Sequence, residues 1–158
     1  MSVFVDWSVN RGDLRIQLAL LMFRIARLVR TRSNLLARIF GKFLCFIYLV
    51  IVEWTWGIEL PWATSVGPRL RIFHGSGIVI NANSRIGADV VLRQGVCIGS
   101  RVPSGECPIV EDGAELGAGA IVLGNISLGR SARIGAGAVV LIDVPEGRAA
   151  AGNPAKLL

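Results

Sequence analysis

Few residue types in this chain could do acid–base or nucleophilic chemistry. His74 is the only histidine among the 158 residues, so any proton transfer through an imidazole has to occur at that position. Zinc sites built from several imidazoles are excluded for the same reason. Cys45, Cys97 and Cys107 are odd in number and show no CxxC spacing, which favours a reduced, cytosolic setting over a disulfide framework.

Composition describes an ordered protein with two chemically different parts. Hydrophobic residues make up 53% of the sequence and charged residues 18%, which excludes intrinsic disorder. Residues 1–56 contain eight basic and three acidic residues, most of the net charge of +6, and nine of the 11 aromatic residues. Seventeen of the 19 glycines lie in residues 57–158. We therefore expect an N-terminal α-helical segment over 1–56 and one further domain over 57–158.

The N-terminal segment has the pattern of two helices. In the first helix, apolar residues recur at steps of three and four and form one stripe. The stripe consists of Leu14, Leu18, Leu21, Ile25 and Leu28. Arg24, Arg27 and Arg30 lie largely off it, and Asp13 is a helix-start signal. These residues predict an amphipathic helix that begins near Asp13.

A second helix is expected from the N-cap candidates Ser33 and Asn34 to Gly57. Its apolar run, residues 43–52, is shorter than the roughly 20 residues that cross a bilayer. Two main interpretations of residues 1–56 stay open, and they can coexist: a hairpin packed on the second domain or on its copies in an oligomer, or basic, aromatic-rich helices on an anionic membrane surface. A true transmembrane span is the third and least favoured interpretation. The protein is expected to be cytoplasmic, at the inner face of the membrane in the second case. Nucleic-acid binding is not expected, because the basic residues alternate with aliphatic ones rather than lining an exposed groove.

The second domain has an aliphatic residue at nearly every sixth position. The series runs Ile80, Ile86, Leu92, Ile98, Ser104, Val110, Leu116, Val122, Leu128, Ile134 and Val140. A period of six fits neither a helix nor a plain strand, but it fits a coil of three short strands with one inward side chain each. Residues three repeats apart, such as Ile80 and Ile98, then stack, and stacking creates the core. We predict a mainly β fold, a parallel β-helix of hexapeptide repeats.

Two interruptions break this repeat. Leu60, Val66 and Ile72 keep the stride of six but are out of phase by two positions with the later series, and the slip falls in residues 73–77, which include His74. The second interruption, residues 99–108, is rich in Pro, Gly and Ser. Loops that leave a rigid solenoid are where function tends to reside, so both are candidate functional segments.

Several motifs in this domain resemble hexapeptide-repeat acyltransferases of the serine O-acetyltransferase type. They are the Gly-Ser-Gly-Ile-Val-Ile run 75–80 after His74, Leu-Gly-Asn-Ile 123–126, the repeat 134–140, Asp-Val-Pro 143–145 and Ala-Gly-Asn-Pro-Ala-Lys 151–156. The chain also resembles colanic-acid and other exopolysaccharide biosynthesis acetyltransferases, which share the short helical N-terminus, the His-Gly pair and a Cys-Pro at 107–108. The resemblance implies a left-handed β-helix.

The activity implied by this resemblance is acetyl transfer from acetyl-CoA to a hydroxyl, with no metal required. His74 would be the general base that takes the hydroxyl proton. Glu59, fifteen positions earlier, would hold the other ring nitrogen, although the serine enzymes have an aspartate at this spacing. At the two acceptor-binding positions, Phe73 replaces an aspartate and Cys107 replaces a histidine. An aromatic ring does not pair with an ammonium group as a carboxylate does, but it could pack against a sugar, which favours a sugar hydroxyl over serine.

The acetyl-CoA site is also implied by the resemblance. Ala118 and Ala136 match small residues that line the pantetheine groove, and Gly99 opens the loop that would cover it. The cations expected at the CoA phosphates are Arg133, Arg148 and Lys156, and Asn153 belongs to the same tail motif. In the family this groove lies between two β-helices of a trimer, so a homotrimer is expected.

Three functions therefore stay open. The first is an acetyl-CoA-dependent O-acetyltransferase that modifies a sugar in bacterial exopolysaccharide or capsule biosynthesis. The second is a serine O-acetyltransferase of cysteine biosynthesis. The third, from a different class, is a non-catalytic β-helix scaffold.

Overall fold

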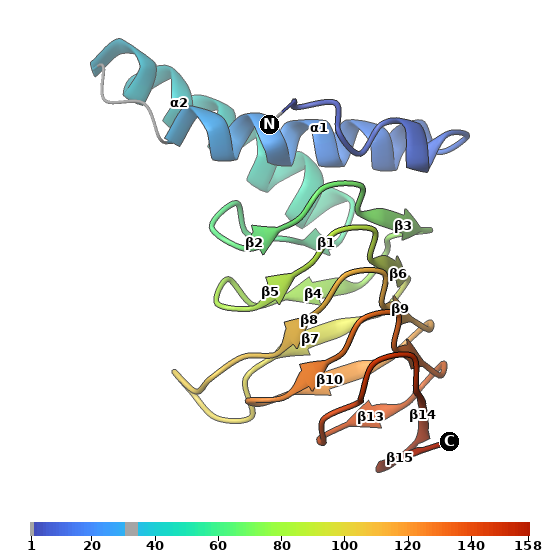
Figure 1. Cartoon of the computed structure of the whole chain (residues 1–158). Coiled ribbons are helices and arrows are strands. Elements are labelled where there is room, and N and C mark those ends of the chain that lie inside the picture. The colour runs from blue at the N-terminus through green and yellow to red at the C-terminus, as the bar shows by residue number, and fades with distance from the viewer. Residues whose placement is uncertain (1, 31–34) are drawn as a thin grey trace.

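The chain folds into a helical part that sits across one end of a tapering stack of short strands (Figure 1). The computed structural model describes the backbone of residues 2–30 and 35–158 and the side chains of residues 2–29 and 39–158. The helical elements are the 3-10 turn η1 (Ser8–Asn10), α1 (Leu14–Arg30), α2 (Leu35–Tyr48) and the π-helical stretch η2 (Leu49–Thr55). The expected N-caps Ser33 and Asn34 lie outside the described residues.

Fifteen short strands follow in the described chain, grouped in three sheets. Sheet A contains β1 (Ile58–Glu59), β4 (Ile78–Ile80), β7 (Cys97–Gly99), β10 (Ile121–Leu123) and β13 (Val139–Val140). Sheet B contains β2 (Ser65–Val66), β5 (Arg85–Ile86), β8 (Ile109–Val110) and β11 (Ser127–Leu128). Sheet C contains β3 (Arg71–Phe73), β6 (Val91–Arg93), β9 (Glu115–Leu116), β12 (Arg133–Ile134), β14 (Ala149–Gly152) and β15 (Ala155–Leu157).

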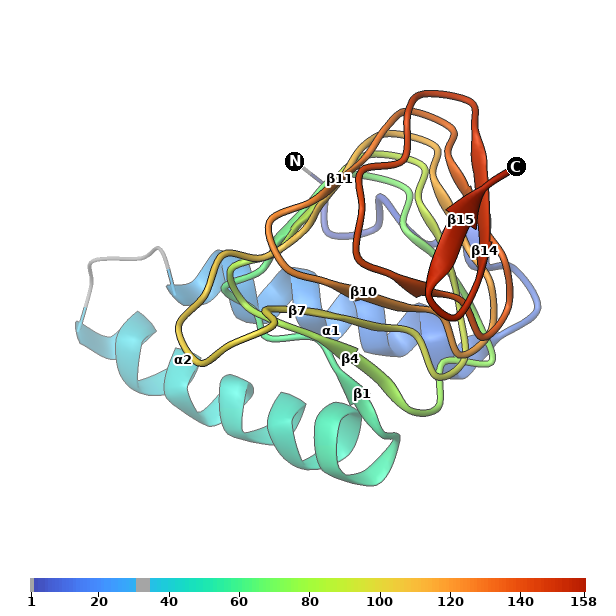
Figure 2. The same cartoon turned by 90° about the horizontal axis from the view of Figure 1, so that it is seen from below.

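The strands form the predicted left-handed parallel β-helix. All strand pairs are parallel except β14 with β15, which closes the C-terminal end as a hairpin. Figure 2 looks along the axis from the C-terminal end, and there the chain runs clockwise through sheets A, B and C as it advances toward the viewer. That sense of rotation defines a left-handed coil.

The strand register confirms the coil of three hexapeptide repeats that the stride of six predicts. Ile80 pairs with Ile98, and Leu116 pairs with Ile134, so each partner lies three repeats further along the chain. All four side chains are almost fully buried, and burial of an aliphatic side chain of this size contributes about 1.5–3 kcal/mol. The core is therefore three columns of stacked aliphatic side chains, one on the inner face of each sheet.

Both interruptions of the repeat are local expansions of a coil. Ile58 pairs with Ile78, so the first coil is longer than a regular one by two positions, which lie in the corner after β3. Ile98 pairs with Val122, one full repeat later than the regular stride gives, because residues 100–108 leave the stack as a loop between sheets A and B. Both segments lie where the sequence predicts them, and they do not disturb the register of the coils on either side.

Helix α1 forms where predicted, but it packs through a different face from the one expected. Of the predicted stripe, Leu14, Leu18 and Leu28 are exposed. The buried face consists of Ile16, Ala19, Leu20, Phe23 and Ala26, together with Gln17 and Arg24. The two faces are roughly 150–180° apart on a helix of 3.6 residues per turn. Because α1 is apolar on both sides, its periodicity alone does not identify the side that meets the solenoid.

Arg24 is a core residue of the helical part, contrary to its expected place off the packed face. Its guanidinium forms two hydrogen bonds to the Asp6 carboxylate, at 2.7 and 3.1 Å, and both side chains are at most 5% exposed. It also donates to the carbonyls of Val66 at 2.8 Å and Gly67 at 2.6 Å. The Asp6 carboxylate in turn accepts the backbone N–H of Leu70 at 3.0 Å. This pair bonds the helical part to the first coil.

Other side chains of the helical part complete this cap. Asn10 donates to the Leu70 carbonyl at 2.9 Å and accepts the Ile72 N–H at 3.0 Å, and the Tyr48 hydroxyl donates to the Leu60 carbonyl at 2.6 Å. The first coil has no coil above it, so these backbone groups would otherwise be an open sheet edge. The helical part is therefore the polar and apolar cap that a solenoid needs at its end.

Helix α2 presents a large apolar surface in the structure of the single chain. Ile39, Phe40, Phe43, Phe46 and Trp54 are each 58–72% exposed. Within the described residues, no helix combines the length and the hydrophobicity needed to cross a membrane.

Candidate active site

His74 lies in the expanded corner between β3 and β4. Its backbone φ is +65°, and Gly75 and Gly77 follow with φ of +60° and +71°. A Cβ on Gly75 would lie 2.6 Å from Cδ1 of Ile16 on α1, so both the backbone conformation and the fit to α1 favour glycine. The additional length of this coil therefore forms a tight outward turn, and the His74 side chain is exposed.

The helical part holds the backbone of His74 and leaves its ring available. The Arg15 guanidinium donates to the His74 carbonyl, which also accepts the Ser76 N–H at 2.8 Å. Among the described residues, neither ring nitrogen of His74 takes part in a hydrogen bond or ion pair. The imidazole can thus offer one nitrogen to a hydroxyl and the other to a carboxylate.

A hollow of about 300 Å³ adjoins His74. It is lined by residues 9–13 of the N-terminal segment and by residues 71–74 of β3 and its corner. Asp13 faces this hollow and also caps α1, because its Oδ1 accepts the Ile16 N–H at 3.1 Å. The site at His74 is therefore built between the cap and the first coil.

Phe73 is half-buried beside His74, with two guanidinium groups against its ring. Cζ of Arg71 is 4.4 Å and Cζ of Arg93 is 5.0 Å from the ring centroid. Arg71 is on the same strand, and Arg93 is the register partner of Phe73 on β6. In the single chain the aromatic surface of Phe73 is thus in contact with arginines, whereas the sequence suggested contact with a sugar.

Glu59 lies on the outer face of sheet A, shortly after Gly57. The Gly57 carbonyl accepts the N–H of Gly77 at 2.8 Å, which places Glu59 next to the corner that carries His74. The structure has no hydrogen bond between the Glu59 and His74 side chains, both of which are described and exposed. Burial raises the pKa of Glu53, and the Glu59 carboxylate adds to that increase. The Glu59 carboxylate therefore acts on the charge of Glu53 and also lies near the corner that carries His74.

Ala118 and Ala136 lie on the same edge of the solenoid as His74. Both sit in the turns from sheet C to sheet A of later coils, and the Ala118 carbonyl accepts the Gly137 N–H at 2.8 Å. One coil nearer His74, the Gln94 carbonyl accepts the equivalent bond from Gly119 at 2.9 Å. The edge below His74 therefore has only small side chains at two of its turns, so a ligand could approach the backbone there.

The loop of residues 100–108 lies at the opposite end of sheet A. Gly99 ends β7 and Cys107 is buried near the end of the loop, with its thiol 3.8 Å from the Gly105 carbonyl. In Figure 2 the loop extends from the left end of sheet A toward α2, whereas the corner after β3 is at the right. One chain therefore does not bring Cys107 and His74 into one site.

The predicted phosphate-binding residues gather near the C-terminal end. Arg133 is exposed on β12, and its N–H donates to the carbonyl of Arg148 at 2.9 Å. Asn153 is exposed in the β14–β15 turn and Lys156 is exposed on β15. These residues form one group on sheet C, several coils below His74.

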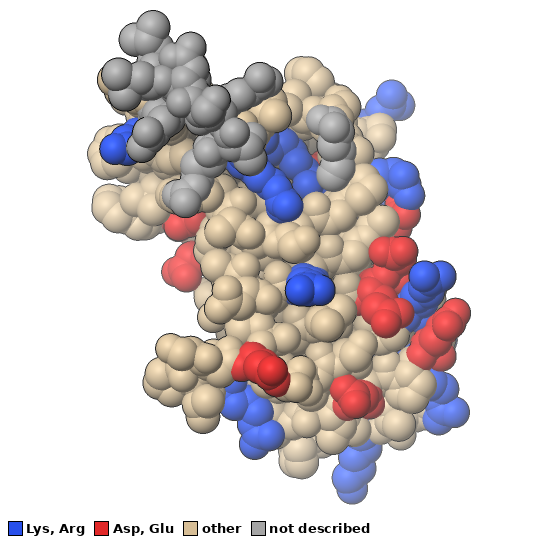
Figure 3. Space-filling model, turned by 60° about the vertical axis from the view of Figure 1, so that its left-hand side comes forward, with Lys and Arg blue, Asp and Glu red and all other residues tan. Residues whose placement is uncertain are grey.

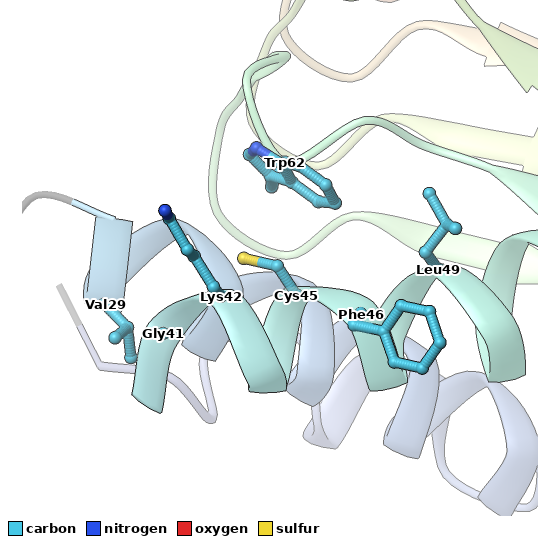
Figure 4. Close-up of a pocket in the computed structure, with 7 residues that line it drawn as sticks. All are labelled: Val29, Gly41, Lys42, Cys45, Phe46, Leu49 and Trp62. Carbon is cyan, nitrogen blue, oxygen red and sulfur yellow. The ribbon is translucent and has the colours of Figure 1, made fainter. Parts of the chain in front are cut away.

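A larger hollow, of about 530 Å³, lies between α2 and the turn after β1. Cys45, Lys42 and Trp62 project into it in Figure 4. Its other lining residues are Val29, Gly41, Phe46 and Leu49. None of the predicted site residues lines it, and its walls are mostly apolar. It therefore belongs with the exposed surface of α2 rather than with His74.

The sequence did not identify Arg15, Arg71 or Arg93 as site residues. A signal for Arg93 was present, because the slip lengthens the first coil and moves the partner of Phe73 from position 91 to position 93. Arg71 occupies the next outward position on the same strand as Phe73. No sequence signal links Arg15 to His74, because that contact depends on how α1 docks.

A left-handed parallel β-helix with an exposed histidine at an expanded corner defines a hexapeptide-repeat enzyme scaffold. No family model matches the chain. The protein that carries the name putative colanic acid biosynthesis acetyltransferase WcaB in Escherichia coli K12 is 37% identical over 126 residues, which is 78% of each chain. Serine acetyltransferase of the same strain is 39% identical over 109 residues, 68% of this chain and 40% of that enzyme.

Solved structures show the same similarity over nearly the whole chain. Soybean serine acetyltransferase without ligand has a TM-score of 0.83 at 30% identity, and the match covers 99% of this chain and 67% of that one. A serine acetyltransferase in complex with CoA has a TM-score of 0.79 at 30% identity, again over 99% of this chain, and 68% of its own. The chain belongs to the hexapeptide-repeat acetyltransferases of the serine acetyltransferase type, and it is an acyltransferase.

Proposed function

We propose that this protein transfers the acetyl group of acetyl-CoA to a sugar hydroxyl during assembly of a bacterial exopolysaccharide. The observation that carries the proposal is the position of His74, whose unbonded ring is exposed beside a hollow at an expanded corner of the solenoid. The acetyl donor is supported by a related structure that contains CoA. The sugar is supported by the relative named for colanic acid biosynthesis.

His74 acts in this mechanism as the general base. One imidazole nitrogen accepts the proton of the acceptor hydroxyl while that oxygen forms a bond to the thioester carbonyl carbon. The tetrahedral intermediate then breaks its carbon–sulfur bond, and the imidazolium returns the proton to the departing CoA thiolate. The products are an acetyl ester and CoA. Glu59, near the same corner, is the carboxylate that turns toward the imidazolium and stabilises its charge.

The acetyl donor lies along the solenoid edge below His74. Ala118 and Ala136 leave room there for pantetheine beside the backbone. The phosphates lie near Arg133, Arg148 and Lys156, with Asn153 in the adjacent turn. Guanidinium groups suit this task because they form paired hydrogen bonds to phosphate oxygens.

The assembly that completes this site is a homotrimer. Gly99 and Cys107 lie at the opposite end of sheet A from His74, so the loop of one subunit covers the site of its neighbour. Outward residues of sheet A, among them Val79 at 40% exposure, supply apolar surface for the contact. Sedimentation equilibrium is expected to give about three times the chain mass of 16.9 kDa. A monomer with full activity contradicts the trimer.

A panel of acceptors separates the proposed substrate from serine. Release of CoA from acetyl-CoA is measured with L-serine, with nucleotide sugars, and with lipid-linked sugar diphosphates in anionic vesicles. We expect turnover only with a sugar, because Phe73 and its two arginines replace the carboxylate that would bind an ammonium group. Co-sedimentation with the vesicles tests whether the exposed α2 surface also contacts lipid. Enzyme-like rates with serine contradict the sugar assignment, and no transfer to any acceptor favours a scaffold.

A further inference from the structure

Arg11 and Arg71 line the hollow beside His74, and Arg93 shares the Phe73 ring with Arg71. This arginine cluster has no role in the proton transfer. From it we infer that the acetyl acceptor carries a phosphate or diphosphate group, bound by Arg71 and Arg93 together with Arg11, which lines the same hollow as Arg71. This inference deepens the proposed function and rests on it. It adds an anion subsite that selects the acceptor and leaves the chemistry at His74 unchanged.

Phe73 brings two of these arginines together. Arg71 and Arg93 place their guanidinium carbons 4.4 and 5.0 Å from the centroid of the same ring. Cation–π contact favours each cation individually, but two like charges at one ring repel each other. Both side chains are exposed, and among the described residues neither has a hydrogen bond or ion pair with an acidic group. An anion between them would relieve this repulsion.

Arg11 and Arg71 connect the cluster to His74. Both line the 300 Å³ hollow that reaches His74, and both also line a neighbouring hollow of about 370 Å³. Arg71 precedes His74 by three positions, which is at most about 10 Å of extended chain. A sugar whose hydroxyl meets His74 could therefore place a phosphate on its other side between these two arginines.

The charge balance of this region is positive. The basic residues are Arg11, Arg15, Arg69, Arg71 and Arg93, and the acidic residues are Asp13, Asp89 and, near the His74 corner, Glu59. Asp89 is engaged by Arg69 at 2.5 Å, a bond that lowers the pKa of Asp89. Basic and acidic side chains intermingle along the solenoid edge at the right of Figure 3.

A phosphate fits this balance better than a single carboxylate does. Phosphate monoesters carry roughly 1.5 to 2 negative charges near neutral pH and offer three acceptor oxygens, whereas an amino acid carboxylate is accompanied by its own ammonium group. Arginine forms bidentate hydrogen bonds with phosphate. Two guanidiniums held against one ring keep their planes and donors ordered before the ligand arrives, which reduces the entropy lost on binding.

Binding of inorganic pyrophosphate to the full-length protein, measured by titration calorimetry, tests this subsite without turnover. We expect saturable binding that R71Q and R93Q each weaken about tenfold, the loss of one charge-assisted contact. F73L retains both charges but loses the aromatic contact, and it should weaken binding severalfold. The matched control is R130Q, an exposed arginine elsewhere on the solenoid, which should leave binding unchanged.

Two further arms distinguish this subsite from the CoA phosphates and from the proposed reaction. Saturating CoA and the variant R133Q should both leave the pyrophosphate affinity unchanged, because the donor site lies several coils away. Pyrophosphate that is displaced by CoA, or that binds R71Q and R93Q as well as it binds the wild type, overturns the inference, as does no binding at all. H74N should bind pyrophosphate normally. Arginine-dependent binding in a protein that acetylates no sugar supports the anion subsite and refutes the proposed reaction.

Discussion

Substitution of His74 by asparagine is expected to reduce acetyl transfer by about two to four orders of magnitude, the usual contribution of a positioned general base. An amide cannot accept the hydroxyl proton, whereas asparagine adopts the left-handed backbone conformation more readily than most residues. The backbone φ of +65° at this corner can therefore persist. Initial rates of CoA release at saturating acetyl-CoA, with the acceptor that the panel identifies, measure the effect.

Two companion measurements make this result specific to proton transfer. The variant should bind CoA with wild-type affinity and unfold at the wild-type temperature, since the His74 ring makes no described hydrogen bond. E59Q should retain more activity than H74N, because it removes only the charge that stabilises the imidazolium. Undiminished transfer by a correctly folded H74N protein would remove His74 from the mechanism.

Replacing Arg24 with methionine should cost about 3–5 kcal/mol of unfolding free energy, the range for breaking a buried ion pair on one side. The change leaves the Asp6 carboxylate buried without its cation and removes donors from the carbonyls of Val66 and Gly67. For a chain of this length each kcal/mol corresponds to roughly 2–4 °C, so the melting temperature should fall by about 6–20 °C. Thermal and urea unfolding followed by circular dichroism would measure the loss.

The chain contains an exposed ion pair of the same chemistry for comparison. Arg69 and Asp89 form a bidentate pair in which both side chains are nearly half exposed. R69M should shift the melting temperature far less than R24M, because water replaces the lost partner. The double variant D6N/R24M should be less destabilised than the sum of its single changes. Equal effects of R24M and R69M would show that the buried pair does not fasten the cap to the solenoid.

The sequence predicts the solenoid well because its repeat is a local property. Each coil buries one aliphatic residue per strand, so the stride of six, the slip at His74 and the loop at 100–108 are all visible as spacing. The strand register decides which residues lie side by side on neighbouring coils. Phe73 lies beside Arg93 because the first coil is longer than a regular coil by two positions. The resemblance supplied the handedness and the expected roles of Glu59 and the CoA-binding residues, which stay predictions here.

The tertiary structure alone decided how the helical part meets this solenoid. Helix α1 has apolar residues on two faces, and its periodicity gives no reason to prefer the face of Phe23 over that of Leu18. The choice follows from Arg24 and Asp6, whose polar groups match unpaired backbone groups of the first coil. Docking on that face also brings Arg15 and residues 9–13 to His74. The reactive residue can therefore be found from the sequence, whereas its surroundings depend on contacts between segments that are distant along the chain.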